Sequence, residues 1–212
     1  MFLKNLKISN NLENVLAYAF TEMLNNAIDH SKSARIKIHM GIEGDNLNFT
    51  IKDFGIGIFA NLKNKLKLGS ELKGAQEVTK GKVTVDPERH TGQGIFFTSR
   101  VADKFVIRSH FLEYLVENKK DNFVIIDLKT KIRGTEVYFS IKKNATIHMT
   151  DIFRKYEDDN ESFSKTEIKV TLFDKYAFLV SRSQAKMILS ELDRFSRIKI
   201  SDPGDSKFSS GE

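Results

Sequence analysis

The sequence predicts an α+β fold, with helices packed on one face of a mixed sheet and a small partial α/β module near the C-terminal end. Apolar residues recur at helical spacing from about Asn11 to His30. Alternating apolar residues predict a β-hairpin over residues 36–51, and several more strands are predicted after a further helix. A helix, a hairpin, another helix and a run of strands, in this order, are typical of an α+β domain.

The first helix is amphipathic, and Asn10 with Glu13 three residues later predicts a capping box at its start. Residues 68–91 show no clear period and are rich in Lys, Gly and Thr, so we expect an irregular stretch that is either a functional lid or disordered. The other predicted elements are hairpin strands over 36–42 and 47–51, a short basic helix over 60–67, a helix over 95–102, and strands over 105–110 (continuing to 116), 122–128 and 135–141.

Composition places the chain among ordinary globular proteins. Its 212 residues are 40% hydrophobic and 29% charged, which is enough to bury a core. The absence of cysteine excludes disulfides and thiolate metal sites and fits a reducing cytoplasm. No apolar run approaches the roughly 18 residues that would span a membrane, and the start has no signal-peptide core. The net charge of +6 permits an acidic or nucleic-acid partner but is equally typical of a solvated surface.

A change of composition near Lys142 predicts a second unit. We expect a main domain over residues 1–145, a charged linker over 146–165, a partial α/β module over 166–200 and a polar, disordered tail over 201–212. The elements predicted inside the module are strands over 167–173, 176–180 and 197–200 and a helix over 182–195.

Glu22 and Asn26 lie four residues apart on the first predicted helix and therefore face the same way, with Asp29 on the same polar stripe. A carboxylate and an amide on one face are able to hold a hydrated Mg²⁺ and to orient a water molecule, as phosphate chemistry requires. A solvent-exposed helix face is the simpler interpretation of the same side chains. The helix alone does not decide between the two.

Two glycine-containing turns add to this signal. The motif Asp53-x-Gly55-x-Gly57 ends a predicted strand; its glycines let a flat ligand approach the backbone, and Asp53 is able to accept a hydrogen bond from an exocyclic amine. The Gly-Gln-Gly sequence at 92–94 opens a predicted helix, whose free N–H groups suit phosphate. Taken singly, each is also typical of an ordinary turn or loop-to-helix junction.

In this order and at these separations, the segments resemble the nucleotide-binding boxes of the gyrase, heat-shock chaperone, histidine kinase and MutL (GHKL) ATPase superfamily. Residues 22–30 (EMLNNAIDH) are similar to its asparagine box, residues 53–58 (DFGIGI) to its first glycine box, and residues 92–95 (GQGI) to its second. Gly134-Thr135, ahead of a strand, resembles its final box. The resemblance covers about two-thirds of the chain.

The resemblance implies a Bergerat-type α/β sandwich that binds ATP together with Mg²⁺. Glu22 would be the general base that activates water or an acceptor hydroxyl, and Asn26 would be the principal Mg²⁺ ligand. Asp53 would bind the adenine amine, with support from Thr135 through a water network. The other implied nucleotide-binding positions lie on the adenine side (Gly55, Gly57 and Ile58) and at the lid (Gly92, Gln93, Gly94 and Ile95).

Other features narrow the resemblance. Sensor histidine kinases place their phospho-acceptor histidine well before the asparagine box, whereas the first histidine here is His30, and gyrase-like relatives carry a transducer domain for which this chain is short. The compact layout resembles the anti-sigma-factor serine kinases, which phosphorylate a serine on a STAS-type antagonist. Residues 179–186 and the helix ending at Phe195 resemble the opening of a STAS-like domain. Within them, Ser181 is either a helix cap with Gln184 or a regulatory phosphoserine.

From the resemblance we expect a bacterial, cytoplasmic regulatory ATPase or serine/threonine protein kinase of the anti-sigma type. Its partners would be ATP or ADP and a sigma-factor or STAS-type protein. The alternative is a non-catalytic switch, in which ATP closes the lid and changes partner binding. A nucleic-acid-linked regulator is a third and weaker reading that rests on net charge. No membrane partner is expected, and homodimerisation is left open.

Overall fold

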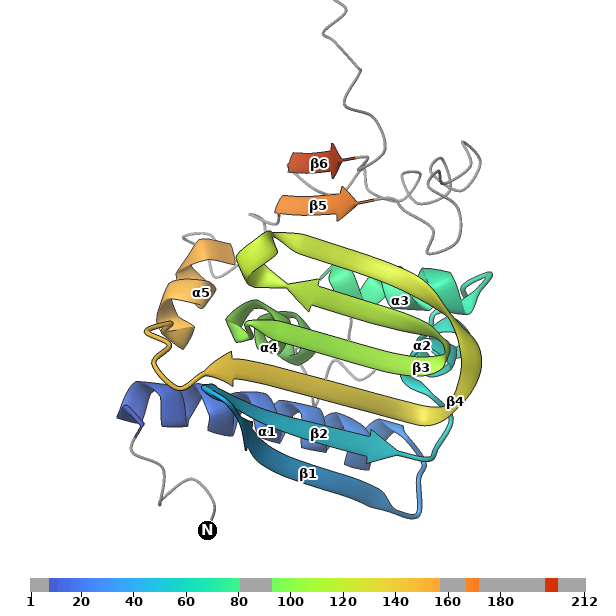
Figure 1. Ribbon diagram of the computed structural model, residues 1–212. Helices are drawn as coiled ribbons and strands as arrows, with labels where there is room; N and C mark the ends of the chain where they lie inside the picture. Colours follow the sequence, from blue (N-terminus) through green and yellow to red (C-terminus); the bar gives the residue numbers. More distant parts are fainter. Residues whose placement is uncertain (1–7, 81–92, 157–166, 172–196, 202–212) are drawn as a thin grey trace, which may run out of the picture.

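The chain folds into a four-stranded sheet with helices against one of its faces (Figure 1). The computed structural model describes residues 8–80, 93–156, 167–171 and 197–201. The elements are α1 (Asn10–His30), β1 (Ile36–Glu43), β2 (Asn46–Asp53), α2 (Ile58–Lys65), α3 (Glu71–Thr79), α4 (Gly94–Val101), β3 (Lys104–Glu117), η2 (Asn118–Lys120), β4 (Asn122–Lys142), α5 (Met149–Tyr156), β5 (Glu167–Thr171) and β6 (Arg197–Ser201).

The sheet has the strand order β1-β2-β4-β3, and every pair of neighbours in it is antiparallel. The α+β class and the placement of helices on one face are confirmed. The prediction of a mixed sheet is wrong for this four-stranded sheet, because it is entirely antiparallel. The reason lies in the connections: β1 and β2 are joined by a tight turn and β3 and β4 by the short helix η2, so both pairs are hairpins, whose strands run antiparallel.

Helix α1 forms the centre of the helical layer. Its cap is Ser9 rather than the predicted Asn10, because the Ser9 hydroxyl accepts a hydrogen bond from the Leu12 N–H at 3.2 Å. The apolar stripe that the sequence predicts faces the sheet, where the ring of Phe20 meets that of Phe49 edge-on at 5.5 Å. The buried residues of α1 are Leu12, Val15, Leu16, Ala19, Met23 and Ala27.

Strand β2 buries every second side chain under this layer, as the alternating pattern predicts, and in β4 the residues Thr135, Val137, Phe139 and Ile141 do the same. Phe49 of β2 and Phe139 of β4 are fully buried and stack with ring centroids 4.9 Å apart. Strands β1 and β2 pair antiparallel, so the predicted hairpin is confirmed; β2 turns its apolar face toward α1, whereas Ile38 and Ile42 of β1 are exposed.

The hairpin β3–β4 contains an irregularity that shapes the candidate site. The strands predicted over 122–128 and 135–141 are one continuous strand, β4. His110 pairs with Ile132 and Leu112 with Asp127, so β4 carries extra residues at this point. The sequence between the predicted strands is polar and contains Gly134, which is typical of a turn; in the fold this segment is a bulge that keeps the strand pairing on both sides.

Two short helices complete the layer. Helix α2 begins two residues before the predicted range of 60–67. Helix α3 lies within residues 68–91, where the sequence predicted an irregular stretch, and the correction has a local cause: the Ser70 hydroxyl caps it by accepting from the Lys73 N–H at 3.2 Å. Ala75 and Val78 of α3 are buried in the core. Residues 81–91 of the predicted lid lie outside the described residues.

The C-terminal segments follow the prediction in part. The predicted linker over 146–165 contains a helix, α5. Strands β5 and β6 are present at the predicted places and pair in parallel, an arrangement that requires a crossover connection between them. The strand predicted over 176–180, the helix over 182–195 and nearly all of the tail over 201–212 lie outside the described residues. Among the described helices, none is long and apolar enough to cross a bilayer.

Candidate functional site

Glu22 and Asn26 lie on the predicted common face of α1, and both are partly buried. The Asn26 side-chain N–H donates to the Glu22 carbonyl oxygen at 2.9 Å, a bond that satisfies the amide nitrogen within the helix. Within the described residues, Asn26 Oδ1 accepts no hydrogen bond. The amide is thus held so that its oxygen remains available as a ligand, whereas Asp29, on the same stripe, is exposed.

The carboxylate of Glu22 lies against the first residue of α4. A Cβ added at Gly94 would collide with Glu22 Oε2, so the glycine is what allows the two to approach. Gln93 is the N-terminal cap residue of α4; its carbonyl accepts from the Phe97 N–H at 2.9 Å, and its side chain makes no capping hydrogen bond. Ile95 packs on the main core. Gly92, the remaining predicted position of this box, lies outside the described residues.

Asp53 ends β2 as a buried carboxylate with 3% relative exposure. Its Oδ1 accepts two backbone hydrogen bonds, from Gly55 N–H at 2.9 Å and from Thr135 N–H at 3.2 Å. In the described part of the chain, Oδ2 accepts none. A buried carboxylate with one oxygen fixed and the other unused is poised to accept a hydrogen bond from a ligand.

The glycines of the first box are required by close backbone contacts. A Cβ at Gly55 would collide with the carbonyl of Ser31, the residue after α1, and that carbonyl also accepts from the Ile56 N–H at 2.9 Å. Gly57 caps α2 with a φ of +80°, and a Cβ there would lie 2.6 Å from Ser109 Oγ. The turn thus contacts both the end of α1 and Ser109 of β3, which lies opposite the bulge of β4.

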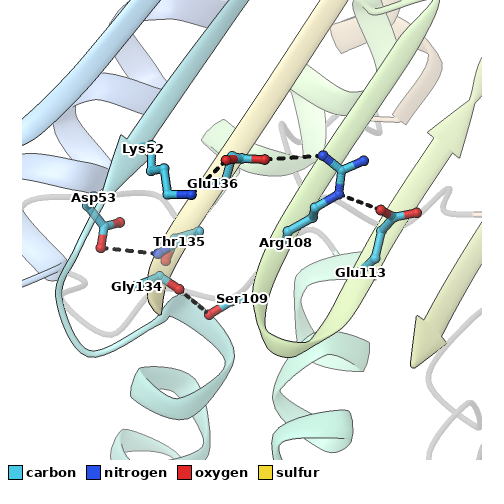
Figure 2. A network of polar contacts seen from close by, with 8 residues as sticks. All are labelled: Lys52, Asp53, Arg108, Ser109, Glu113, Gly134, Thr135 and Glu136. Atoms are coloured by element: carbon cyan, nitrogen blue, oxygen red, sulfur yellow. Dashed lines mark hydrogen bonds and ion pairs between the residues drawn. The ribbon is translucent and has the colours of Figure 1, made fainter. Parts of the chain in front are cut away.

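Thr135 joins the same cluster through its side chain. Its Oγ1 accepts from the N–H of Ile58, the first residue of α2, at 3.0 Å. Gly134, just before it, has a φ of +72°, and a Cβ at this position would collide with the backbone of Asp53. The Ser109 hydroxyl donates to the Gly134 carbonyl at 2.9 Å (Figure 2). Gly134 and Thr135, next to the bulge of β4, therefore hold Asp53 in place through these backbone contacts.

A charged network holds the same strands together on the opposite face of the sheet (Figure 2). Glu136 accepts from Lys52 at 3.0 Å and from Arg108 at 3.1 Å, and Arg108 also donates to Glu113 at 2.6 Å. Burial alone would raise the pKa of Glu136, but the hydrogen bonds and charges of Lys52 and Arg108 outweigh it and lower that pKa. Lys52 and Glu136 are sequence neighbours of Asp53 and Thr135, so the network fixes the strand ends that carry the buried carboxylate.

Several residues of the site were not identified from the sequence. Ser109 contacts the glycine turn, and no local motif marks it. His110 lies at the bulge with a φ of +50°, and its Nδ1 lies 3.0 Å from the carboxylate of Glu71, which ties α3 to the bulge. Tyr18 is one turn before Glu22; burial, and secondly the charge of Glu22, raise the pKa of its phenol. In the sequence, Tyr18 could have been linked to the site only by its spacing of four residues from Glu22, which places both on one helix face.

The predicted residues thus form two groups. The first group, near the C-terminal end of α1, consists of Asp53, Gly55, Gly57, Ile58 and Thr135. The second group consists of Glu22 and Asn26 on α1 and of Gly94, which lies against Glu22. Within the described residues, no group of three or more His, Asp or Glu side chains is arranged to hold a metal ion. Asn26 Oδ1 fits a Mg²⁺ that takes its other ligands from phosphate oxygens and water, since Mg²⁺ is commonly bound in that way.

Comparison with known families agrees with this geometry. The family model of the histidine kinase-like ATPase domain matches residues 2–113, just over half of the chain, and the chain belongs to this family. The match includes the residues of both groups except Thr135, since it ends at residue 113 in β3. The chain is therefore an ATP-binding protein of the histidine kinase-like type. A search among curated proteins finds no match.

Proposed function

We propose that this protein is a Mg²⁺-ATP-dependent regulatory enzyme that transfers the terminal phosphoryl group of ATP to water or to a serine or threonine hydroxyl of a partner protein. The observation that carries the proposal is the contact between Glu22 and Gly94. It places a carboxylate at the start of a helix, where free N–H groups favour phosphate, and one helical turn from an available amide oxygen.

The dimensions of the site support a nucleotide that lies along α1. Glu22 and Ser31 are nine residues apart, which is about 13 Å along a helix. Ser31 contacts the glycine turn that follows Asp53, so the two groups of residues are separated by about the length of an extended nucleoside triphosphate. Adenine binds at Asp53 and the terminal phosphate at Glu22.

In this mechanism, Asp53 Oδ2 accepts a hydrogen bond from the adenine amine, while its Oδ1 is held by the backbone of Gly55 and Thr135. Gly57 and Ile58 form the adenine floor with Gly55. Bound Mg²⁺ supplies charge neutralisation on the phosphates, and Asn26 is the residue that holds it.

Glu22 takes the proton of the attacking hydroxyl or water, and the first turn of α4 stabilises the negative charge that develops on the phosphoryl oxygens. As the resemblance implies, Gly92 and Gly94 would let a lid close over the phosphates; of the two, Gly94 lies among the described residues. The two groups of site residues thus give each end of the nucleotide its own set of contacts.

We further propose a protein partner and a bipartite chain. Residues 1–145 form the ATPase domain, 146–165 the connecting segment, 166–200 a STAS-like module and 201–212 a tail. The parallel pairing of β5 and β6 supports an α/β module, since such a pair needs a crossover of a dozen or more residues and 25 residues separate the two strands. A sigma-factor or STAS-type protein is the proposed partner, as for the anti-sigma kinases that the sequence resembles.

Calorimetry with Mg²⁺-ATP and Mg²⁺-ADP tests nucleotide binding. Asp53→Asn should weaken both nucleotides because an amide is a poorer and misoriented acceptor for the adenine amine. The matched control is Asp45→Asn in the exposed hairpin turn, which should bind like the wild type. If the wild type ignores ATP, ADP and non-hydrolysable analogues alike, the proposal fails.

Phosphate release and phosphotransfer from labelled ATP test catalysis. Glu22→Ala and the isosteric Glu22→Gln should both abolish turnover and leave nucleotide affinity within a few-fold, because a general base acts on the attacking group. Asn26→Ala should impair affinity and turnover together, since it removes the metal ligand. Binding without turnover, with any candidate partner, would contradict the enzyme and leave the ATP-dependent switch as the function.

A further inference from the structure

An aromatic cluster connects α5 to both helices of the proposed phosphate end. We define the cluster as Tyr18, Phe96, Phe97, Ile152 and Phe153. The ring of Phe153 lies edge-on to that of Phe97, with centroids 4.5 Å apart, and to that of Tyr18, with centroids 6.2 Å apart. This aromatic cluster is distinct from the main core, and its two central residues, Phe96 and Phe97, are almost completely buried.

The cluster lies one helical turn from each side of the Glu22–Gly94 contact. Tyr18 is four residues before Glu22 on α1, and Phe97 is three residues after Gly94 on α4, so each shares a helix face with its neighbour at the site. The influence of the Glu22 charge on the pKa of the Tyr18 phenol agrees with this proximity. Phe153 therefore contacts Tyr18 and Phe97, the neighbours of Glu22 and Gly94 on their two helices.

The two ends of α4 are held differently. At the C-terminal end, the Asn118 side chain donates to the carbonyls of Ser99 and Ala102 at 2.7 and 2.6 Å. Arg100 lies over the ring of Phe123 at 4.1 Å, which adds a second attachment to the β3–β4 hairpin. At the N-terminal end, no side chain of the described residues caps the helix. Near this end, Phe97 packs in the aromatic cluster, while Ile95 packs on the main core.

Helix α5 is itself fixed to α1. The Asn11 side chain donates to the carbonyl of Ile147, just before α5, at 2.5 Å. Met149 and Ile152 of α5 pack on both the aromatic cluster and the main core. On the other side of the helix, Asp151, Arg154 and Lys155 are exposed. An amphipathic helix docked in this way carries a rigid aromatic side chain to the junction of α1 and α4.

From this packing we propose that Phe153 is a positioning residue, which holds the start of α4 against Glu22 through Phe97 and Tyr18. The proposal rests on the proposed phosphoryl-transfer function. Loss of the ring leaves a void between the two helices, and α4 then tilts about its anchored C-terminal end. The adenine contacts at Asp53 are made at the other end of α1 and stay intact. A segment beyond the matched ATPase family region thus controls the alignment of the general base.

The first test compares turnover and nucleotide affinity. Phe153→Ala should lower kcat by about 10- to 100-fold, since a misplacement of about 1 Å costs on the order of 100-fold, and should leave the KM for ATP within about threefold. Phe153→Leu, which restores bulk, should recover most of kcat. The control is Leu47→Ala, a buried residue outside the cluster, which should lower the melting temperature without this selective loss of kcat.

A second measurement does not depend on activity. Hydrogen exchange without nucleotide should rise in Phe153→Ala for peptides that cover residues 18–24 and 94–100, and should not rise selectively there in Leu47→Ala. If the wild type turns over ATP but Phe153→Ala keeps its kcat, the positioning role is wrong while the proposed function stands. If the wild type shows no turnover, the proposed function fails, and unchanged exchange in Phe153→Ala would overturn the positioning role as well.

Discussion

Replacement of Gly94 by alanine separates the function of the Glu22 contact from its effect on stability. The added Cβ would occupy the place of Glu22 Oε2, which is the far end of a flexible side chain. Because the side chain can rotate away, the backbone need not move. Gly94→Ala is therefore expected to displace the carboxylate and leave the fold intact.

The magnitudes of the two effects differ widely. Alanine favours a helix over glycine by about 1 kcal/mol in the helix interior and by less in the first turn, so stability should stay within about 1 kcal/mol of the wild type. For a chain of this size, that is a melting temperature shift of about 2–4 °C at most. A displacement of the carboxylate by about 1 Å should lower kcat about 100-fold, equivalent to about 2.7 kcal/mol of transition-state stabilisation.

The assay is phosphate release or phosphotransfer from labelled ATP, with thermal unfolding measured on the same samples. Gly69→Ala is the matched control, because a Cβ at that position meets no atom within 4 Å. A Gly94→Ala protein with kcat within twofold of the wild type would refute the reasoning, since the position of the Glu22 carboxylate would then not matter for turnover.

Three further predictions concern stability. Gly134→Ala should cost about 2–5 kcal/mol, from a left-handed backbone and a clash with the backbone of Asp53, whereas Gly44→Ala, with open space around it, should cost only the backbone term of about 1–2 kcal/mol in urea unfolding; equal losses would contradict the close packing. Because the pKa of Glu136 is lowered in the fold, its contribution is present above the unfolded pKa and lost as pH falls through the folded pKa. The deficit of Glu136→Gln, about 1 kcal/mol at pH 7, should therefore shrink as the pH falls below 4.5. The raised pKa of Tyr18 has the opposite consequence: stability falls as pH rises above about 10, and Tyr18→Phe should lose less of it on alkaline unfolding.

Local sequence patterns predicted the elements that depend on local interactions. The period of α1, the alternation of the first hairpin and the start of α4 agree with the structure within one or two residues. Helix α3 was missed because Lys73 and Gly74 hide a short apolar period, and β4 was divided because a bulge and a turn have similar compositions. Tertiary packing adds to the local signals in both segments: Ala75 and Val78 of the Ser70-capped α3 are buried in the core, and the strand pairing of β4 continues on both sides of the bulge.

The sequence by itself determined that α1 carries Glu22 and Asn26 on one face and that Asp53 stands at the end of a strand, because motif order and periodicity are properties of neighbouring residues. Only the tertiary structure decided which groups meet. Thr135 donates to Asp53 across 82 residues, Gly94 lies against Glu22, and Phe153 packs behind both helices. Such contacts follow from the packing of helices on a bulged sheet, which brings together residues whose separation in the sequence carries no periodic signal.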